Sequence, residues 1–168
     1  MNAVLTALGG IVSGNPGPSE AALRVLAQQD GFAALLAQIA GAHPTSVEEG
    51  IRQAAAVVLK NHAKAHWDPD SRAYVAPEVP EPEKAQVRMQ LLHALGDPSS
   101  KVRTAVGMAI VAIQEVDYPH AWPDVISSLV QLIQEGSSDM GGCGNNNNEG
   151  TETLHAGGAA LIMHDTSG

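Results

Sequence analysis

Two histidines, His62 and His66, have the spacing at which one helix can present two ligands to a metal ion. Residues four apart lie on the same helix face, so both rings would point the same way. The intervening residues are Ala63, Lys64 and Ala65, which lack the glutamate of a zinc-protease motif. No facing third ligand is evident and Lys64 adds unfavourable charge, so we expect no metal here. A metal-dependent enzyme that uses this pair remains one of three hypotheses about function, and the other two are given at the end of this section. Metal analysis of the purified protein tests it.

Other catalytic signatures are missing from the sequence. It contains no Gly-x-Ser-x-Gly elbow, phosphate-binding Gly-Lys-Ser/Thr loop or dinucleotide fingerprint. The paired acids Glu48 and Glu49 are explained by helix capping and the helix dipole. Cys143, with His155 and His164, lies in Gly- and Asn-rich sequence, and as the single cysteine it fits a reducing compartment. We therefore expect neither an enzyme nor a bound cofactor.

Charge is distributed unevenly along the 168 residues, whose formal net charge is −9. All nine Lys and Arg residues lie in 1–103, whereas 104–168 holds eight acidic residues and no Lys or Arg. Nucleic-acid binding needs clustered cations and, for single strands, aromatic side chains, which make up only 3% of this chain. We therefore expect no nucleic-acid partner and favour a partner with a basic surface. No run of 18 apolar residues occurs, so we expect no membrane insertion.

The elements that position these residues are predicted to be helices. Apolar residues recur at helical spacing, and a core of Ala, Leu, Val and Ile suits closely packed helices. Asp30 is expected to cap one helix, and the segment 46–49 to form a capping box at another. The Pro-rich segment 67–82 should be an exposed, extended loop. Helices are expected over residues 3–12, 19–29, 31–40, 47–66, 83–96, 100–116 and 121–135.

These helices are expected to form repeated pairs, because an apolar residue followed by Arg recurs near the start of three second helices. The mean interval between these arginines is close to a helical-repeat period of ~40 residues. One helix pair cannot bury its apolar faces alone, so the pairs should stack into an array over residues 1–135. Residues 136–168 should form a Gly- and Asn-rich tail, with 153–163 as a partial inner helix of a fourth repeat. The three pairs are Leu23-Arg24, Ile51-Arg52 and Val102-Arg103.

The segment 89–113 resembles a HEAT repeat. Asp97 ends its outer helix, Pro98 breaks that helix, and Arg103 stands at the start of the inner helix. The resemblance implies an all-α HEAT-repeat α-solenoid, a right-handed superhelix of antiparallel helix pairs with about three and a half repeats. It also implies charge-assisted hydrogen bonds between Asp and Arg of neighbouring repeats, with Asp97 and Arg103 as candidates.

Two further motifs resemble the N-terminal domain of the importin-β (karyopherin) family. The first is R-x-x-A-x-x-x-L-K-N followed by a tryptophan, and the second is D-aromatic-P-x-x-W-P. Their order and separation, with the HEAT-like unit between them, also match, and the resemblance covers residues 1–135. A His-Trp helix ending and the Pro-rich acidic loop are most similar to the importin nine branch. The motif residues are Arg52, Ala55, Leu59, Lys60, Asn61, Trp67, Asp117, Tyr118, Pro119, Trp122 and Pro123.

The second motif also has a mechanical explanation. Asp117 and Pro119 should end one helix, while Pro123 should lie in the first turn of the next, where a missing N–H costs little. Trp122 could then fold back over the junction. Large aromatic side chains near helix ends mostly pack, so Asp117, Trp122 and Trp67 are expected to be structural.

The family resemblance implies a partner, the GTP form of the small GTPase Ran. It places the Ran site on the inner helices 19–29, 47–66 and 100–116, where GTP-Ran displaces import cargo or stabilises export cargo. Basic nuclear cargo proteins are implied as further partners, nucleoporins as partners of a longer protein, and shuttling between cytoplasm and nucleus as the localisation. We expect the chain to be a fragment of such a receptor. The alternative is a HEAT scaffold that binds another protein and ignores Ran. The candidate Ran contacts are Gln28, Gln53, Lys60, Asn61 and Lys64.

Overall fold

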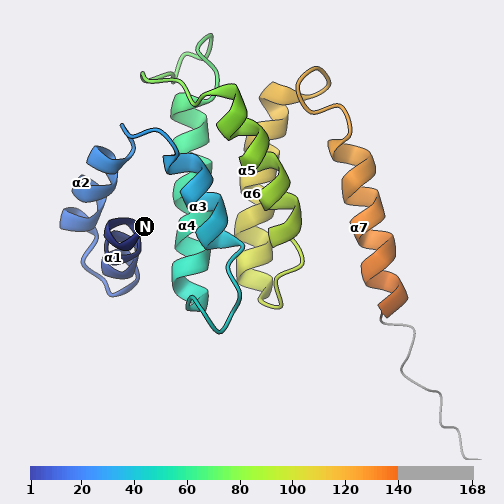
Figure 1. Cartoon of the computed structure of the whole chain (residues 1–168), viewed down its shortest axis with the longest axis horizontal. Coiled ribbons are helices and arrows are strands. Elements are labelled where there is room, and N and C mark those ends of the chain that lie inside the picture. The colour runs from blue at the N-terminus through green and yellow to red at the C-terminus, as the bar shows by residue number, and fades with distance from the viewer. Residues whose placement is uncertain (140–168) are drawn as a thin grey trace, which may run out of the picture.

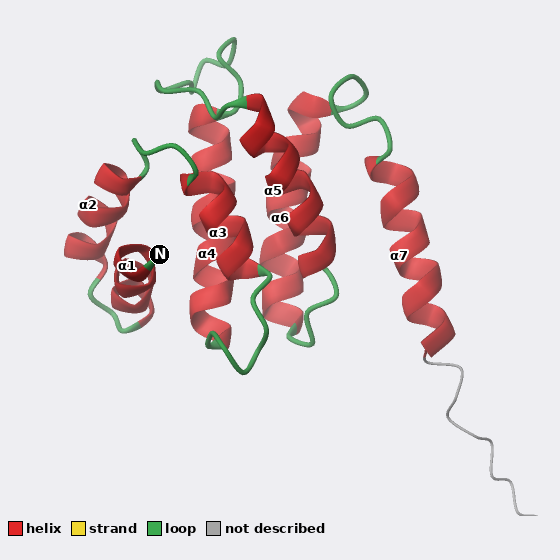
Figure 2. Cartoon of the chain, viewed as in Figure 1, coloured by secondary structure: helices red, strands yellow, loops and turns green. Residues whose placement is uncertain are grey.

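The protein is a stack of antiparallel helices, seen in a computed structural model that describes residues 1–139 and side chains through residue 135. Helices and no strands occupy the described residues (Figure 2). The pair α3 and α5 packs in front of the pair α4 and α6 (Figure 1). This arrangement confirms the predicted all-α HEAT-repeat solenoid. The helices are α1 (Asn2–Val12), α2 (Pro16–Leu26), α3 (Phe32–Ala40), α4 (Glu49–His66), α5 (Glu81–Ala94), α6 (Ser100–Asp117) and α7 (Val125–Asp139).

One continuous apolar core runs along the stack. It contains buried side chains from every helix pair and includes many alanines, which let neighbouring helix backbones approach closely. Leu8, Leu36, Leu59, Leu91 and Ile113 are fully buried, one from each of five helices. No helix in the described part of the chain is long and apolar enough to span a membrane.

Several helix ends differ from the sequence prediction. Helix α2 begins at Pro16, three residues before Ser19, because proline is well suited to the first helical turn. The predicted capping box is wrong: Glu48 precedes α4 without a side-chain cap, and Ser46 instead donates its N–H to His43 in a turn. Helix α7 continues to Asp139, beyond the predicted end at residue 135. The predicted helix 153–163 lies outside the described residues.

The N-terminus of α3 is capped by a side chain from another repeat. Asp30 does not cap it; Gly31 is the N-cap, with a left-handed φ of 83° that favours glycine. The Glu83 carboxylate of α5 accepts hydrogen bonds from the Gly31 N–H at 2.9 Å and the Ala34 N–H at 3.0 Å. Two of the free donors of α3 are thereby satisfied, and the carboxylate complements the helix dipole.

We expect Glu83→Ala to lower the free energy of unfolding by about 1 kcal/mol, the usual effect of losing a capping side chain. Urea denaturation of the whole chain measures this change. Glu83→Gln keeps an oxygen acceptor and should lose less than the alanine variant. Equal stability of the alanine variant and the wild type would contradict a capping role for Glu83.

Candidate functional site

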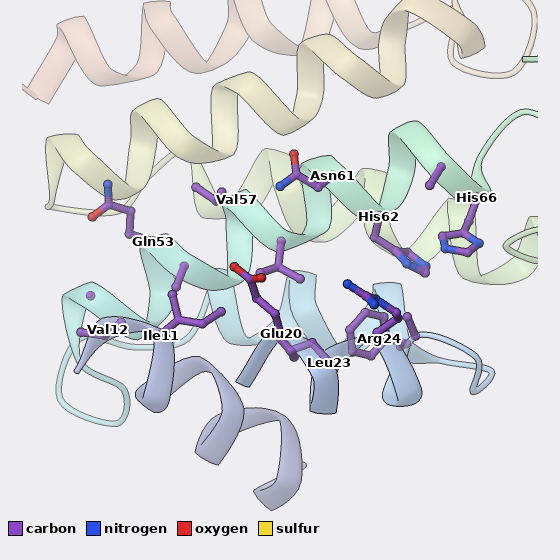
Figure 3. A pocket seen from close by; sticks show the side chains of 16 residues that line it. Ile11, Val12, Glu20, Leu23, Arg24, Gln53, Val57, Asn61, His62 and His66 are labelled. Atoms are coloured by element: carbon purple, nitrogen blue, oxygen red, sulfur yellow. The ribbon is translucent and has the colours of Figure 1, made fainter. Parts of the chain in front are cut away.

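Four of the five predicted contact residues lie on α4, and the structure divides them between two flanks of that helix. Lys60 and Lys64 face α6, where they line a groove of about 420 Å³. Gln53 and Asn61 line a larger groove of about 780 Å³ between α4 and the α1–α2 pair (Figure 3), and Gln53 also borders α6. Gln28 lies beyond the end of α2, is exposed and lines neither groove. The five residues therefore do not form a single cluster.

The groove between α4 and α6 combines apolar and charged side chains. Met108 and Val111 of α6 are each 51% exposed, and they share this groove with Lys60 and Lys64. Glu115 adds one acidic group to the lining. Exposed apolar side chains beside charged ones are typical of protein-binding surfaces. We call this surface, made by these five residues, the α4–α6 face.

Both α4 and α6 are held in place by a buried polar network at their C-terminal ends. Asp117, the last residue of α6, is buried and accepts a hydrogen bond from the Trp67 indole Nε1 at 3.0 Å. Its second carboxylate oxygen accepts from the Arg88 Nε at 2.8 Å. Trp67 directly follows α4, and Arg88 belongs to α5. One carboxylate thus ties together three helices, as well as the two predicted sequence motifs.

Cations from α5 surround the Trp67 ring. The Lys84 Nζ lies 5.5 Å from the ring centroid, and the Arg88 Cζ lies 5.9 Å from it. Both distances suit a cation–π interaction. The Arg88 Nη1 also donates to Glu81 at 2.7 Å. Burial alone would lower the pKa of Arg88, but its hydrogen bonds to Asp117 and Glu81 raise that pKa, so the guanidinium stays charged.

The junction after α6 is closed by Trp122. Its side chain is buried, and its backbone N–H donates to the Asp117 carbonyl at 3.0 Å. Pro119 and Pro123 are both exposed. The prediction that Pro123 lies in the first turn of the next helix is wrong, because α7 begins only at Val125.

An Asp–Arg pair joins neighbouring repeats, although with a different arginine from the one predicted. Arg52 of α4 forms a buried ion pair with Asp97, and its Nε donates to the Val47 carbonyl at 3.1 Å. Arg103 is exposed; its Nη1 donates to the carbonyls of Asp97 and Pro98 at 2.8 Å and 2.9 Å. Within the described residues Arg103 pairs with no carboxylate, so it supports the turn of its own repeat.

His62 and His66 share a helix face but stack on each other. Their ring centroids are 4.3 Å apart, and the His62 ring meets Phe32 edge-on at 5.0 Å. The His66 Nδ1 forms a hydrogen bond of 3.0 Å with the Pro77 carbonyl, which fastens the Pro-rich loop to α4. Residues 1–139 contain no group of three potential metal ligands. This geometry gives the two histidines a packing role at the end of the larger groove.

The cations of α5 were missed by the sequence reasoning. Lys84 and Arg88 lie one turn apart on α5 and are buried, although apolar spacing, which predicts this helix, indicates no buried charge on it. A signal was present, because a structural Asp117 needs a cation or a strong donor nearby. The cation that pairs with Asp117 is Arg88, 29 residues away in sequence, and no local sequence pattern predicts a partner at that separation.

Comparison with known proteins identifies the family. Residues 19–97 match the importin-β N-terminal domain. The chain is 31% identical over 118 residues to importin subunit beta-5 of Schizosaccharomyces pombe, and 29% identical over 139 residues to Importin-9 of Drosophila melanogaster. These matches cover 69% and 78% of this chain, but only 12% and 13% of the two relatives. Exportin-2 of Danio rerio is 24% identical over 96 residues, which are 54% of this chain and 9% of that relative.

The matched region contains the structural elements described above. It spans α2 to α5, with the Arg52–Asp97 pair, both flanks of α4 and Trp67. The Importin-9 match agrees with the branch predicted from the helix ending and the Pro-rich loop. The chain therefore belongs to the importin-β family, and residues 19–97 are its importin-β N-terminal domain.

Proposed function

We propose that the chain binds the GTP form of Ran through the α4–α6 face, as part of a receptor that carries proteins between cytoplasm and nucleus. The observation that carries the proposal is the convergence of Lys60 and Lys64, which lie in the matched importin-β N-terminal domain, with Met108 and Val111 of the next repeat in one groove. Exposed apolar groups would provide contact area, and the lysines would steer an acidic patch of the GTPase. Gln53 and Asn61 would contribute from the far side of α4, and Gln28, which follows the groove-lining Ala27 just beyond α2, would contribute at the edge of the larger groove.

The proposal extends to cargo and direction of transport. The chain spans about an eighth of the length of the first two relatives, so cargo recognition is proposed for a longer receptor. We favour import of basic nuclear proteins, because 104–168 holds eight acidic residues and no Lys or Arg. Shuttling through nuclear pores, with contacts to nucleoporins, follows from the same proposal. The alternative is a scaffold whose α4–α6 face binds another protein.

Immobilised Ran loaded with GTP or GDP tests this proposal. We expect the chain to be retained by GTP-Ran and not by GDP-Ran. Reversing both charges with Lys60→Glu and Lys64→Glu should weaken binding at least about ten-fold, because interfacial charge complementarity is inverted. Both lysines lie at the surface of α4, so the variant should remain folded.

Arg72→Glu is the matched control, since Arg72 is an exposed cation in the loop after α4 and lines neither groove. It should bind GTP-Ran like the wild type. Equal retention on both nucleotide forms would overturn the proposal. Loss of binding in the Arg72 variant to the same degree would show a nonspecific charge effect and would also overturn it.

A further inference from the structure

The larger groove follows one side of α4 along almost its whole length. Its lining residues on α4 recur every three or four positions from Gly50 to His66, so they form one stripe along the helix. That stripe is roughly 24 Å long at 1.5 Å per residue. The opposite wall comes from the end of α1 and from α2, including Leu23. Figure 3 shows Ile11 and Val12 at one end and His66 at the other.

This groove exists because the first repeat stacks differently from the others. Helix α4 packs extensively on α6 with its other flank, but on this flank its main neighbour is α1 rather than α2. The contact with α1 is tight, since a Cβ on Gly50 would lie 3.0 Å from the Val12 Cγ1. The position that α2 would occupy in a regular stack is therefore partly open.

The lining is mainly apolar, with a few polar groups in defined places. Glu20 and Arg24 stand one turn apart on α2, and both are exposed. Neither forms an ion pair with any described residue. At the end of the groove near His66, His62 is only 8% exposed, and its Nδ1 makes no hydrogen bond with the described residues. A buried polar atom without a partner is costly, which makes this end of the groove incomplete as a packed interior.

We propose that this groove binds an amphipathic helix of a partner protein, of about 16 residues, with its apolar face against α4. A helical segment of that length matches the stripe of roughly 24 Å. Glu20 and Arg24 of α2 determine the charges expected on the flank of the partner helix. That helix places a carboxylate against Arg24 and, one turn away, an ammonium group against Glu20. The inference does not rest on the proposed function: Lys60 and Lys64 line the other flank of α4, and although Gln53 and Asn61 line this groove as well, peptide binding is measured without Ran.

A designed peptide provides the probe. It has 16 residues, leucines at helical spacing on one face, and one Glu and one Lys four positions apart on the flank. A second peptide exchanges that Glu and Lys, and a third scrambles the leucines at equal composition. Fluorescence anisotropy with the whole chain should show binding of at least one of the first two peptides and at least ten-fold weaker binding of the scrambled one.

Two variants locate the peptide in the groove. Ala54→Glu places a charged side chain on the groove floor and should weaken binding about ten-fold, whereas Val25→Glu, on an exposed part of α2 that lines no groove, should not. The double variant Glu20→Lys with Arg24→Glu should reverse the preference between the two charged peptides, by about three- to five-fold for two surface ion pairs. Both charged positions are exposed, so this double variant tests the proposal even if Ala54→Glu unfolds.

Three results would overturn the proposal. One is equal binding of the scrambled peptide, and another is a peptide preference that the charge exchange leaves unchanged. The third is concentration-dependent self-association of the chain, seen by ultracentrifugation and abolished by Ala54→Glu. That result would place a second copy in the groove, for example through the exposed Ile126 and Ile133 of α7. GTP-Ran binding is measured separately through Lys60 and Lys64, so the two proposals can fail independently.

Discussion

Replacing Asp117 with alanine is expected to lower the free energy of unfolding by about 3–5 kcal/mol, the usual cost of breaking a buried ion pair on one side. The substitution leaves the Arg88 guanidinium buried beside Trp67 with only Glu81 as a charged partner. It also leaves the Trp67 indole N–H without an acceptor, and this hydrogen bond is buried. The Asp117 carboxylate makes both the ion pair with Arg88 and the hydrogen bond with Trp67, so one substitution removes both interactions and the effect is large.

Urea denaturation followed by far-ultraviolet circular dichroism measures this loss. Asp70→Ala is the matched control, because Asp70 is an exposed acid in the loop after α4 and should change stability by less than about 0.5 kcal/mol. Combining Asp117→Leu with Arg88→Met should cost less than the sum of the two single changes, since no buried charge is then left alone. A loss below about 1 kcal/mol in the alanine variant would contradict the central role of this carboxylate.

The same network shows where sequence reasoning reaches its limit. Helical periodicity predicted every helix within the described residues, because each apolar stripe is a local property of its own segment. The sequence predicts separate packing roles for the motif that ends in Trp67 and the motif that begins at Asp117, whereas the structure joins them by a direct hydrogen bond. That bond spans 50 residues, and the third member, Arg88, stands in a helix with no motif of its own. Local patterns contain no information about such pairings.

Helix ends were less predictable for the same reason. The Ser46–Glu49 pattern has the composition of a capping box, but Ser46 is used by a turn with His43 instead. The N-terminus of α3 needed a cap, and the nearest candidate in sequence was Asp30. The actual cap is Glu83, about 50 residues away, because α5 packs beside α3. A tertiary contact thus takes the place of the local cap at α3, whereas before α4 a competing local turn takes the place of the capping box.

The candidate site was predicted as a helix face but not as two surfaces. The sequence shows which residues of α4 are polar. Whether such a residue faces α2 or α6, however, depends on how those helices stack against α4. Lys60 and Lys64 face α6, while Asn61 faces the α1–α2 side. The irregular stacking of the first repeat, which opens the larger groove, follows from contacts such as Gly50 with Val12. Repeat periodicity predicts an ideal stack and therefore does not predict this opening.

His62 is expected to make the protein markedly less stable in acid. Burial, with the neighbouring His66 as a smaller cause, lowers the pKa of His62 from its ordinary value near 6.5 to about 4. Arg24, which lines the same groove from α2, adds a further positive group there. Between pH 6.5 and 4 the unfolded chain therefore takes up a proton that the folded chain does not bind. Stability from this group is complete above pH 6.5 and falls as the pH approaches 4, by up to about 3 kcal/mol.

Denaturation curves at pH 7.0 and pH 4.5 for the wild type and for His62→Leu measure this effect. Leucine has a similar volume and no proton to bind, so the variant should lose about 2–3 kcal/mol less stability than the wild type over this interval. His120→Leu is the control, because His120 is exposed and should leave the wild-type pH dependence intact. The rest of the chain is identical in the wild type and His62→Leu, so its contribution to the pH dependence cancels in the comparison. Equal losses in the wild type and His62→Leu would mean that His62 is protonated in the folded chain, which its stacking against Phe32 and His66 opposes.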